Sequence, residues 1–298
     1  MEKVIVITGP TGVGKTKISI EVAKKINTEI INGDAYQIYQ KMNIGTAKPT
    51  KEELSEVKHH FFDFLDPSCE FSVSDYQKEI RKLIDEFHEN NKVPLIVGGT
   101  GLYIDSVIRN YQFLAPKRKE DHEYDELSNH ELHQILEKLD FNASLQIHEN
   151  NRKRVLRAIE LAKTNDFSSR TLKNEFVYDA LVIFLNDERT VLYDRINKRV
   201  DKMIEDGLVE EVKSLYPDAL GKTAKAAIGY KELFAYFNNE TSKEEAIEKI
   251  KQNSRHYAKR QMTWYRNQEC TKIVNVNVNN LDETINEVLT LISDHLQK

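Results

Sequence analysis

The sequence predicts an α/β protein in which a parallel-sheet core is interrupted by a helical insertion. Short apolar runs, each followed by a helix-like run with one apolar face, recur from the beginning of the chain. The middle of the chain, Tyr111 to Phe176, is charged and has no strand-like run. Strand character returns at Val177–Leu185, which makes the intervening block an insertion. The core is therefore predicted at 1–112 and 177–298, and the insertion at 113–176.

The whole-chain composition is ordinary for a globular protein, with 298 residues, 31% of them charged and 40% hydrophobic. A net charge of −5 gives no global attraction to nucleic acid, so any such surface requires local segregation of charge. Cys69 and Cys270 lie far apart and form no metal or redox pattern, as expected of thiols in a reducing compartment. The apolar run Val4–Ile7 is too short for a signal-peptide core, and no run approaches transmembrane length. We therefore expect a cytoplasmic protein.

The first predicted strand ends in a glycine-bounded loop. Gly9, Gly14, Lys15 and Thr16 fit the spacing G-x-x-x-x-G-K-[ST], and a helix-like run follows from Lys15 to Ile26. Small residues let backbone N–H groups surround an anion, Lys15 adds a point charge, and the Thr16 hydroxyl can ligate Mg²⁺. The alternative is a glycine-rich turn that binds nothing. The motif favours a site for a di- or triphosphate on a core like that of nucleoside-triphosphate hydrolases.

The second predicted strand, Glu29–Asn32, leads directly into Asp34. In an open α/β sheet, ligands bind in the crevice at the carboxyl ends of the strands, so this carboxylate is a candidate for the same site. A helix N-cap is an equally good interpretation of Asp34. The polar, glycine-containing segment Tyr39–Pro49 is then expected to be a loop.

A further helix and strand complete the first half of the core. Ser72 and Asp75 can cap a helix that runs to about Asn90, and Val93–Val97 predicts a buried strand that ends in Gly98-Gly99-Thr100. Phosphate-loop kinases and ATPases usually carry an acidic, Mg²⁺-binding residue at the end of such a strand. Its absence argues against a routine ATPase and leaves Asp34 as the nearby carboxylate.

Two groups of basic residues follow, and for each there is an alternative interpretation in which it binds no ligand. Arg152, Lys153, Arg154 and Arg157 cluster in the insertion, where a solvated helix face would explain them equally well. After the strand at 177–185, Arg195 and Arg199 lie four residues apart on one helix face and could clamp a pyrophosphate. The alternative is a pair of surface ion pairs with Asp194 or Glu205.

The longest helical pattern, Lys243 to about Gln268, has six Lys or Arg and no acid in its second part, from Lys249 onward. Tyr257, Trp264 and Tyr265 are interleaved with these cations. Cations that meet phosphates and rings that stack on bases make this helix a candidate RNA surface. Alternatively the aromatic residues pack into the core, which we expect for Trp264. An edge strand at 272–276 and a closing helix at 281–296 end the pattern.

Seven short motifs occur in a fixed order along the chain: GPTGVGKT at 9–16, NGDAYQIY at 32–39, MNIGTAKP at 42–49, VGGTGLY at 97–103, RVLRAIE at 154–160, AAIGYKE at 226–232 and AKRQMTWYR at 258–266. With them the chain resembles, nearly end to end, the bacterial tRNA dimethylallyltransferase (tRNA isopentenyltransferase) family. The resemblance implies transfer of a dimethylallyl group from dimethylallyl diphosphate to N6 of the adenosine 3′ of a tRNA anticodon. Diphosphate is released, Mg²⁺ is the cofactor, and the partner is the anticodon stem-loop. A monomeric, cytoplasmic enzyme with no membrane contact is expected.

The resemblance also implies roles for individual residues. The catalytic positions are Asp34 as general base, Thr100 near the reacting adenosine, and Arg199 on the pyrophosphate. A positioned proton acceptor is needed because an adenine amino group is a poor nucleophile. The diphosphate-binding positions are Gly9, Thr11, Gly12, Val13, Gly14, Lys15 and Thr16, of which Thr16 is also the metal ligand. The tRNA-binding positions are Asp34, Ala35, Tyr36, Gln37, Thr100, Arg154, Arg157, Gly229, Tyr230, Lys231, Lys259, Arg260 and Gln261.

Three other functions compete with this interpretation. An adenylate isopentenyltransferase would modify free AMP and would not need the two basic segments. A small-molecule kinase would use Asp34 to activate a hydroxyl, but the Gly-Gly-Thr strand end counts against it. An RNA-binding nucleotide switch would keep tRNA affinity and release no pyrophosphate from dimethylallyl diphosphate.

Overall fold

The computed structural model describes residues 1–113, 123–163, 175–266, 268 and 270–298. These residues form two compact units. The larger unit consists of Met1–Ile108 and Phe176–Lys298, and the smaller one of Arg109–Glu175. The chain leaves and re-enters the larger unit at adjacent points, since Val177 N donates to Ile108 O at 3.0 Å.

The larger unit is built on a six-stranded sheet in the order β3-β2-β4-β1-β5-β6, and every neighbouring pair is parallel. The predicted α/β class and parallel core are therefore confirmed, with β6 on an edge as expected. The strands are β1 (Lys3–Thr8), β2 (Ile30–Asn32), β3 (His59–His60), β4 (Leu95–Gly98), β5 (Asp179–Asn186) and β6 (Thr271–Asn275).

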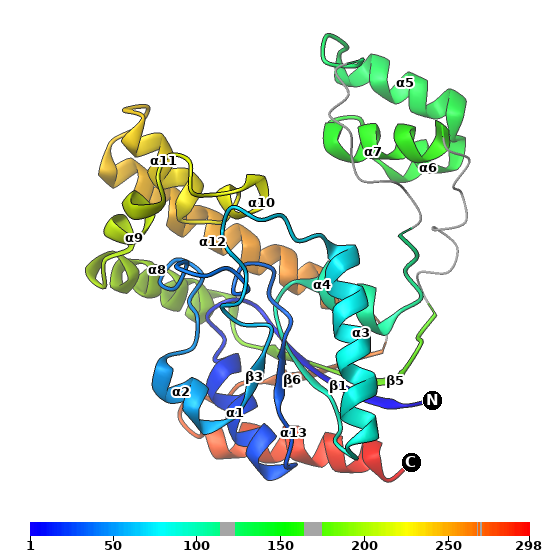
Figure 1. The fold of residues 1–298 in the computed structure, drawn as a ribbon, viewed down its shortest axis with the longest axis vertical. Helices are drawn as coiled ribbons and strands as arrows, with labels where there is room; N and C mark the ends of the chain where they lie inside the picture. The colour runs from blue at the N-terminus through cyan, green and yellow to red at the C-terminus, as the bar shows by residue number, and fades with distance from the viewer. Residues whose placement is uncertain (114–122, 164–174, 267, 269) are drawn as a thin grey trace. The chain divides into compact units, whose positions relative to one another are not determined.

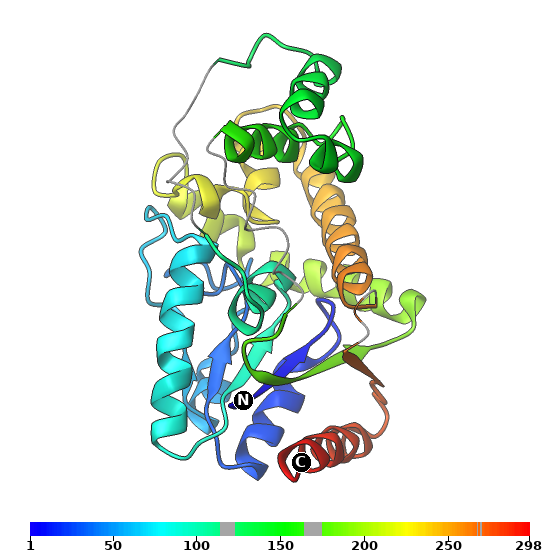
Figure 2. The ribbon, with the colours of Figure 1, turned by 90° about the vertical axis from the view of Figure 1, so that its right-hand side faces the viewer.

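Helices cover both faces of this sheet (Figures 1 and 2). On one face lie α1 (Lys15–Lys25) and α13 (Leu281–Leu296), which contact each other. On the opposite face lie α3 (Val73–Glu89) and α4 (Gly101–Ile108). Val4, Ile5, Val6 and Ile7 of β1 are consequently all fully buried. A strand that is covered on both sides reads as a continuous apolar run, which is the signal the sequence carries.

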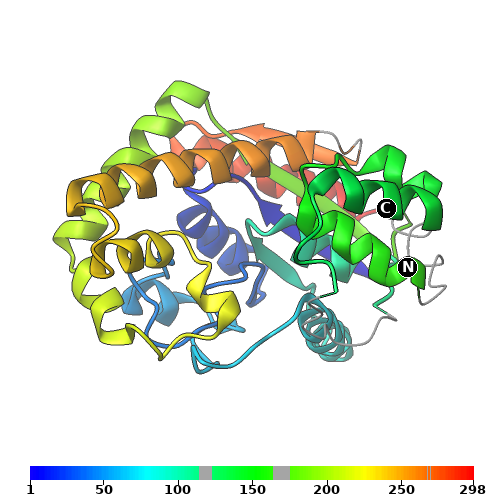
Figure 3. The same ribbon diagram turned by 90° about the horizontal axis from the view of Figure 1, so that it is seen from above.

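A second group of helices lies beyond the carboxyl ends of the strands. It comprises α8 (Arg189–Glu205), α9 (Leu208–Leu215), α10 (Lys222–Lys225), α11 (Tyr230–Phe237) and α12 (Lys243–Arg266). These helices share a hydrophobic cluster with the loop that follows β2, and Ile38, Tyr39, Leu208 and Tyr230 are fully buried in it. Figure 3 shows α12 running along this group, where it contacts α4, α8 and α11. The short α2 (Lys51–Glu56) follows the loop.

The smaller unit contains α5 (Asn129–Leu139), α6 (Phe141–Gln146) and α7 (Arg152–Lys163) around its own apolar cluster. Leu132, Leu136, Val155 and Ile159 are fully buried there. The sequence predicts helices joined by polar turns in this block, and the part that the structure describes has them. Among the helices described in either unit, none is both long enough and apolar enough to cross a membrane.

Candidate active site at the carboxyl end of the sheet

The loop Gly9–Thr16, called the phosphate loop below, connects β1 to α1. Gly12 and Gly14 have φ values of +83° and +100°, a left-handed region that side chains rarely adopt, so the loop needs glycine at both positions. The Lys15 ammonium donates to Gly9 O at 2.9 Å and to Pro10 O at 3.0 Å. Burial, reinforced by the positive charge of Arg199, lowers the pKa of Lys15 to about 8. Lys15 therefore lies in a buried site with a second cation nearby. An anion bound there would raise the pKa of Lys15 and keep its ammonium group protonated.

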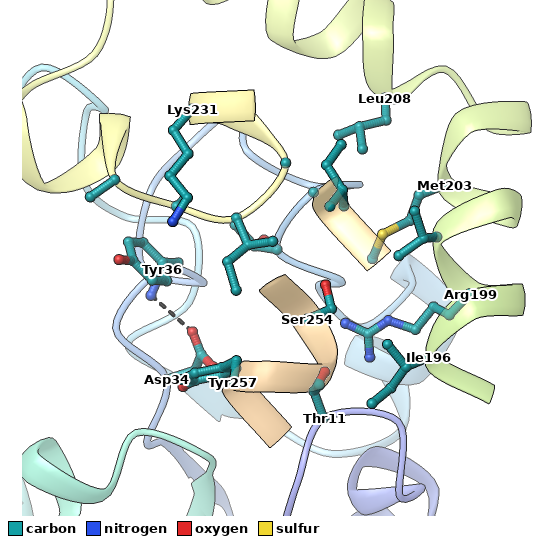
Figure 4. Close-up of a pocket in the computed structure, with 18 of the residues that line it drawn as sticks. Thr11, Asp34, Tyr36, Ile196, Arg199, Met203, Leu208, Lys231, Ser254 and Tyr257 are labelled. Carbon is teal, nitrogen blue, oxygen red and sulfur yellow. Dashed lines mark hydrogen bonds between the residues drawn. The ribbon is translucent and has the colours of Figure 1, made fainter. Parts of the chain in front are cut away.

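Asp34 follows β2 in a tight turn and does not begin a helix. Its Oδ1 accepts a bond from Tyr36 N at 2.9 Å (Figure 4), while Asn32 Oδ1 accepts from Asp34 N at 2.9 Å. These interlocked side-chain turns fix the carboxylate with respect to the strand end. The N-cap interpretation is thus wrong.

The surroundings of Asp34 raise the pKa of its carboxyl group. Burial raises the pKa of Asp34 above its usual 3.8, and the Tyr36 N–H, Lys15 and Arg199 oppose that rise. A carboxyl group whose pKa is raised in this way is a better proton acceptor than a solvated one.

Thr100 lies beside the segment that carries Asp34 because glycines let two loops touch. Gly33 N donates to Val97 O at 2.7 Å and Thr100 N donates to Gly33 O at 3.2 Å. A Cβ on Gly98 would lie 2.2 Å from the carbonyl carbon of Gly33, so no larger residue fits without a shift of the backbone. The Thr100 hydroxyl then accepts from the N–H of Ala35 at 3.1 Å.

Two adjoining cavities meet at Asp34. The phosphate-loop cavity is lined by Gly12, Gly14, Lys15, Thr16, Gly98, Gly99 and Gln261, among others. The second cavity has an apolar wall of Ile196, Val200, Met203, Leu208 and Ile250, and polar or basic residues that include Tyr36, Lys231 and Arg260 (Figure 4). The residues that line both are Thr11, Asp34, Thr46, Arg199 and Tyr257. A ligand in one cavity would therefore be adjacent to a ligand in the other.

Of the two arginines that the sequence places on one helix face, Arg199 lines both cavities and Arg195 lines neither. Burial lowers the pKa of Arg199, and the nearby Asp34 carboxylate opposes this effect. Arg195 instead pairs with Asp187 at 2.7 Å, a partner different from the two that the sequence suggested. Of the predicted pair, only Arg199 is therefore placed to contact a ligand in these cavities.

The other predicted RNA-facing residues of the larger unit differ in exposure. Tyr36, Gly229 and Lys231 line the second cavity, and Lys259 and Arg260 are exposed on α12. The Gln37 amide is used within the loop, donating to Thr46 O at 3.1 Å and to Ala47 O at 3.0 Å. The remaining side chains face the protein interior, namely Ala35, which is 8% exposed, Tyr230, which is fully buried, and Gln261, which is 5% exposed. Val13 of the phosphate loop is likewise buried.

Arg154 and Arg157 belong to α7 of the smaller unit. Arg154 is exposed, and the Arg157 guanidinium pairs with Glu160 at 2.8 Å. Their neighbour Arg152 donates to Leu127 O and Tyr124 O, both at 2.6 Å, and so ties α7 to the turn that precedes α5. One member of the basic cluster therefore has an evident structural role.

Sequence reasoning missed the apolar wall of the second cavity and the place of Tyr257 between the cavities. The spacing of Ile196, Val200 and Met203 does indicate an apolar helix face. It carries no signal that this face borders a cavity, because core and cavity walls use the same residue types. Trp264, expected in the core, is partly buried, and its ring N–H donates to Asp105 at 3.0 Å.

A parallel sheet with a glycine-rich phosphate loop after β1 and a cationic crevice at its carboxyl edge defines a phosphate-loop α/β protein. A family model described as IPP transferase matches residues 37–268, and the chain belongs to this family. It is accordingly a transferase, as predicted.

Known relatives and solved structures are similar along nearly the whole chain. A protein of Bacillus cytotoxicus named tRNA dimethylallyltransferase is 48% identical over 277 residues, covering 89% of this chain and 88% of the relative. The structure of the full-length tRNA isopentenylpyrophosphate transferase from Bacillus halodurans has a TM-score of 0.74 and 41% identity, covering 100% of this chain and 99% of that one. A eukaryotic dimethylallyltransferase described as acting on tRNA has a TM-score of 0.82 at 26% identity, covering 99% and 79%.

Proposed function

We propose that this protein transfers a dimethylallyl group from dimethylallyl diphosphate to N6 of the adenosine 3′ of the anticodon in tRNA, forming N6-dimethylallyladenosine and releasing diphosphate. The observation that carries the proposal is the meeting of two cavities at Asp34. One cavity has the residues of a diphosphate site, and the other has room beside aromatic and basic groups. The names of the relatives support prenyl transfer to tRNA.

The phosphate loop, Lys15 and Arg199 would hold the diphosphate. Both cations line the phosphate-loop cavity, and burial, together with the positive charge of Arg199, lowers the pKa of Lys15. As the bond from the allylic carbon to the diphosphate oxygen breaks, negative charge grows on the leaving group. Cations placed there beforehand would stabilise that charge.

Asp34 would act as the general base. When the adenine N6 attacks the allylic carbon, the nitrogen gains a bond and must lose a proton, which the Asp34 carboxylate can accept. The raised pKa of Asp34 and its rigid turn suit this role. Thr100, joined to the same segment through Ala35, would help to place the adenosine.

Mg²⁺ would bind with the diphosphate, with the Thr16 hydroxyl as the protein ligand. Thr16 lines the phosphate-loop cavity, and a hard cation prefers oxygen donors. No cluster of three or more His, Cys, Asp or Glu that could hold a metal occurs among the residues that the structure describes. This donor set fits an ion that takes most of its ligands from substrate and water. Its chemistry would be to neutralise charge on the departing diphosphate.

The RNA would lie over the exposed cations of α12 and the rim of the second cavity. Lys259 and Arg260 are exposed, and Lys231 and Arg260 line that cavity. A base must leave its stack to reach Asp34, and Tyr36 and Tyr257 offer aromatic surface there. Arg154 and Arg157 remain proposed RNA contacts of the insertion.

The decisive experiment is incubation with dimethylallyl diphosphate, Mg²⁺ and unmodified tRNA, followed by mass analysis of the nucleosides. The expected product is N6-dimethylallyladenosine at the position 3′ of the anticodon, with one pyrophosphate released per modified base. Free AMP in place of tRNA should remain unmodified. Modification of AMP, or transfer of labelled γ-phosphate from ATP to an acceptor, would contradict the proposal in favour of the rival enzymes.

A further inference from the structure

The inward face of α12 reaches the phosphate loop through Gln261. Lys259 and Arg260 on the same helix are exposed, but Gln261 is only 5% exposed. Its Oε1 accepts a bond from Thr11 N at 2.9 Å, and its Nε2 donates to Gly99 O at 2.9 Å. A single amide thus bridges the loops that follow β1 and β4, two strands that are neighbours in the sheet.

This bridge requires both a donor and an acceptor at the end of a side chain of fixed length. A carboxylate could accept from Thr11 but could not donate to Gly99, and a shorter amide would not span both partners. The main chain is also adapted to it, since a Cβ on Gly99 would lie 2.2 Å from Gln261 Nε2. The close approach of the amide therefore depends on glycine at position 99.

The bridge connects the two halves of the proposed site. Thr11 belongs to the phosphate loop and lines both cavities. Gly99 is followed by Thr100, whose hydroxyl accepts from Ala35 N beside Asp34. Gln261 thereby fixes the spacing between the loop for the anion and the segment that carries the carboxylate.

We propose that Gln261 is a positioning residue that holds the leaving diphosphate in register with Asp34. It acts through Thr11 and Gly99, and the inference rests on the proposed function. Because reactive groups must be placed to within fractions of an ångström, loss of the bridge should affect both diphosphate binding and turnover. It should leave tRNA affinity unchanged, which differs from the RNA-contact role that the family resemblance implies for this residue.

The test compares Gln261→Ala and Gln261→Glu with Thr263→Ala, an exposed position on the same helix. Binding of Mg²⁺-pyrophosphate is measured by calorimetry, tRNA binding by filter retention, and steady-state rates with each substrate varied. Loss of the bridge in Gln261→Ala should weaken pyrophosphate binding about tenfold and raise the KM for dimethylallyl diphosphate by a similar factor. The KM and Kd for tRNA should stay within about twofold of the wild-type values, as should all constants of Thr263→Ala.

The glutamate variant supplies a readout that a merely structural role would not move. Its carboxylate cannot donate to Gly99 O and places a negative charge beside the anion, so it should bind pyrophosphate more weakly than Gln261→Ala. Protonation restores a donor and removes the charge. Its affinity relative to Gln261→Ala should therefore rise as the pH falls through the titration of that carboxyl group.

Wild-type pyrophosphate affinity in Gln261→Ala would overturn the inference, as would loss of tRNA affinity in both Gln261 variants with pyrophosphate binding intact. Failure of the wild-type protein itself to bind Mg²⁺-pyrophosphate would overturn the proposed function and the inference with it. If Gln261→Ala proves too unstable to study, the nearly isosteric glutamate variant decides. A pH-independent affinity ratio between that variant and the wild type would then overturn the inference.

Discussion

Asp34→Asn separates the chemical role of Asp34 from its structural one. Asparagine has nearly the same size, and its Oδ1 can keep the 2.9 Å bond from Tyr36 N. The bonds between the Asn32 side chain and the backbone of residue 34 do not involve the substituted group. The substitution therefore removes charge and basicity while the turn is retained.

The expected magnitude follows from the surroundings of the carboxylate. A positioned base contributes roughly 10²–10⁴ in rate, so turnover should fall by at least about 10², or about 2.7 kcal/mol of activation free energy. Pyrophosphate affinity should not fall, because Lys15 and Arg199 stay in place and a repelling charge near the anion is lost. The free energy of unfolding should not fall either. Burial raises the folded-state pKa of Asp34 above 3.8, so the ionised carboxylate destabilises the fold above that raised pKa.

The assay is single-turnover transfer to tRNA at saturating dimethylallyl diphosphate, over a range of pH. Wild-type turnover should fall as the pH drops through the raised pKa of Asp34, and the residual rate of Asp34→Asn should lack that acid limb. The control is Asp66→Asn, because Asp66 is an exposed carboxylate nearby in the chain. This variant should keep the wild-type dependence of turnover on pH. Turnover of Asp34→Asn within about threefold of wild type would refute the reasoning. Loss of pyrophosphate binding in Asp34→Asn would instead show that its carboxylate shapes the site.

Three further predictions follow from other features. The pKa of Lys15, about 8, predicts that pyrophosphate affinity falls as the pH rises above 8; Lys15→Arg, which stays charged, should lack this decline in calorimetry. Joint substitution of Lys259 and Arg260 by alanine should weaken tRNA binding and reduce the slope of log affinity against log salt by up to about 2, and an unchanged slope would remove this face from the RNA surface. Gly98→Ala forces a Cβ to 2.2 Å from the backbone of Gly33 and should cost about 3 kcal/mol in urea unfolding, so a wild-type midpoint would contradict the tight contact between these strand ends.

The sequence predicts the core elements well where the pattern is long or capped. The capping residues Ser72 and Asp75 predict the start of α3, and they form a capping box in the structure. The closing helix is predicted at 281–296, the bounds of α13. The strand β3 has two residues and takes its place in the sheet by pairing with β2, so it carries no periodic signal of its own.

Side-chain roles within the site are less predictable because they depend on contacts between distant segments. Arg195 and Arg199 are equivalent by spacing, but Asp187 pairs with Arg195 and only Arg199 lines the cavities. Gln261 lies in a basic helix that favours a surface role, yet its amide is buried against two loops more than 150 positions away. Local sequence pattern predicts neither outcome, because tertiary packing at the edge of the sheet decides which distant groups Arg195 and Gln261 contact.

The way the insertion is attached makes the protein modular. Ile108 and Val177 are hydrogen-bonded neighbours, and Asn110 N donates to Glu175 O at 2.8 Å just beyond them. With respect to the sheet, the insertion is a long loop whose two ends are held together by these hydrogen bonds. The entropy of closing such a loop grows only with the logarithm of its length. A change in the length of the insertion should therefore cost the core little free energy of folding.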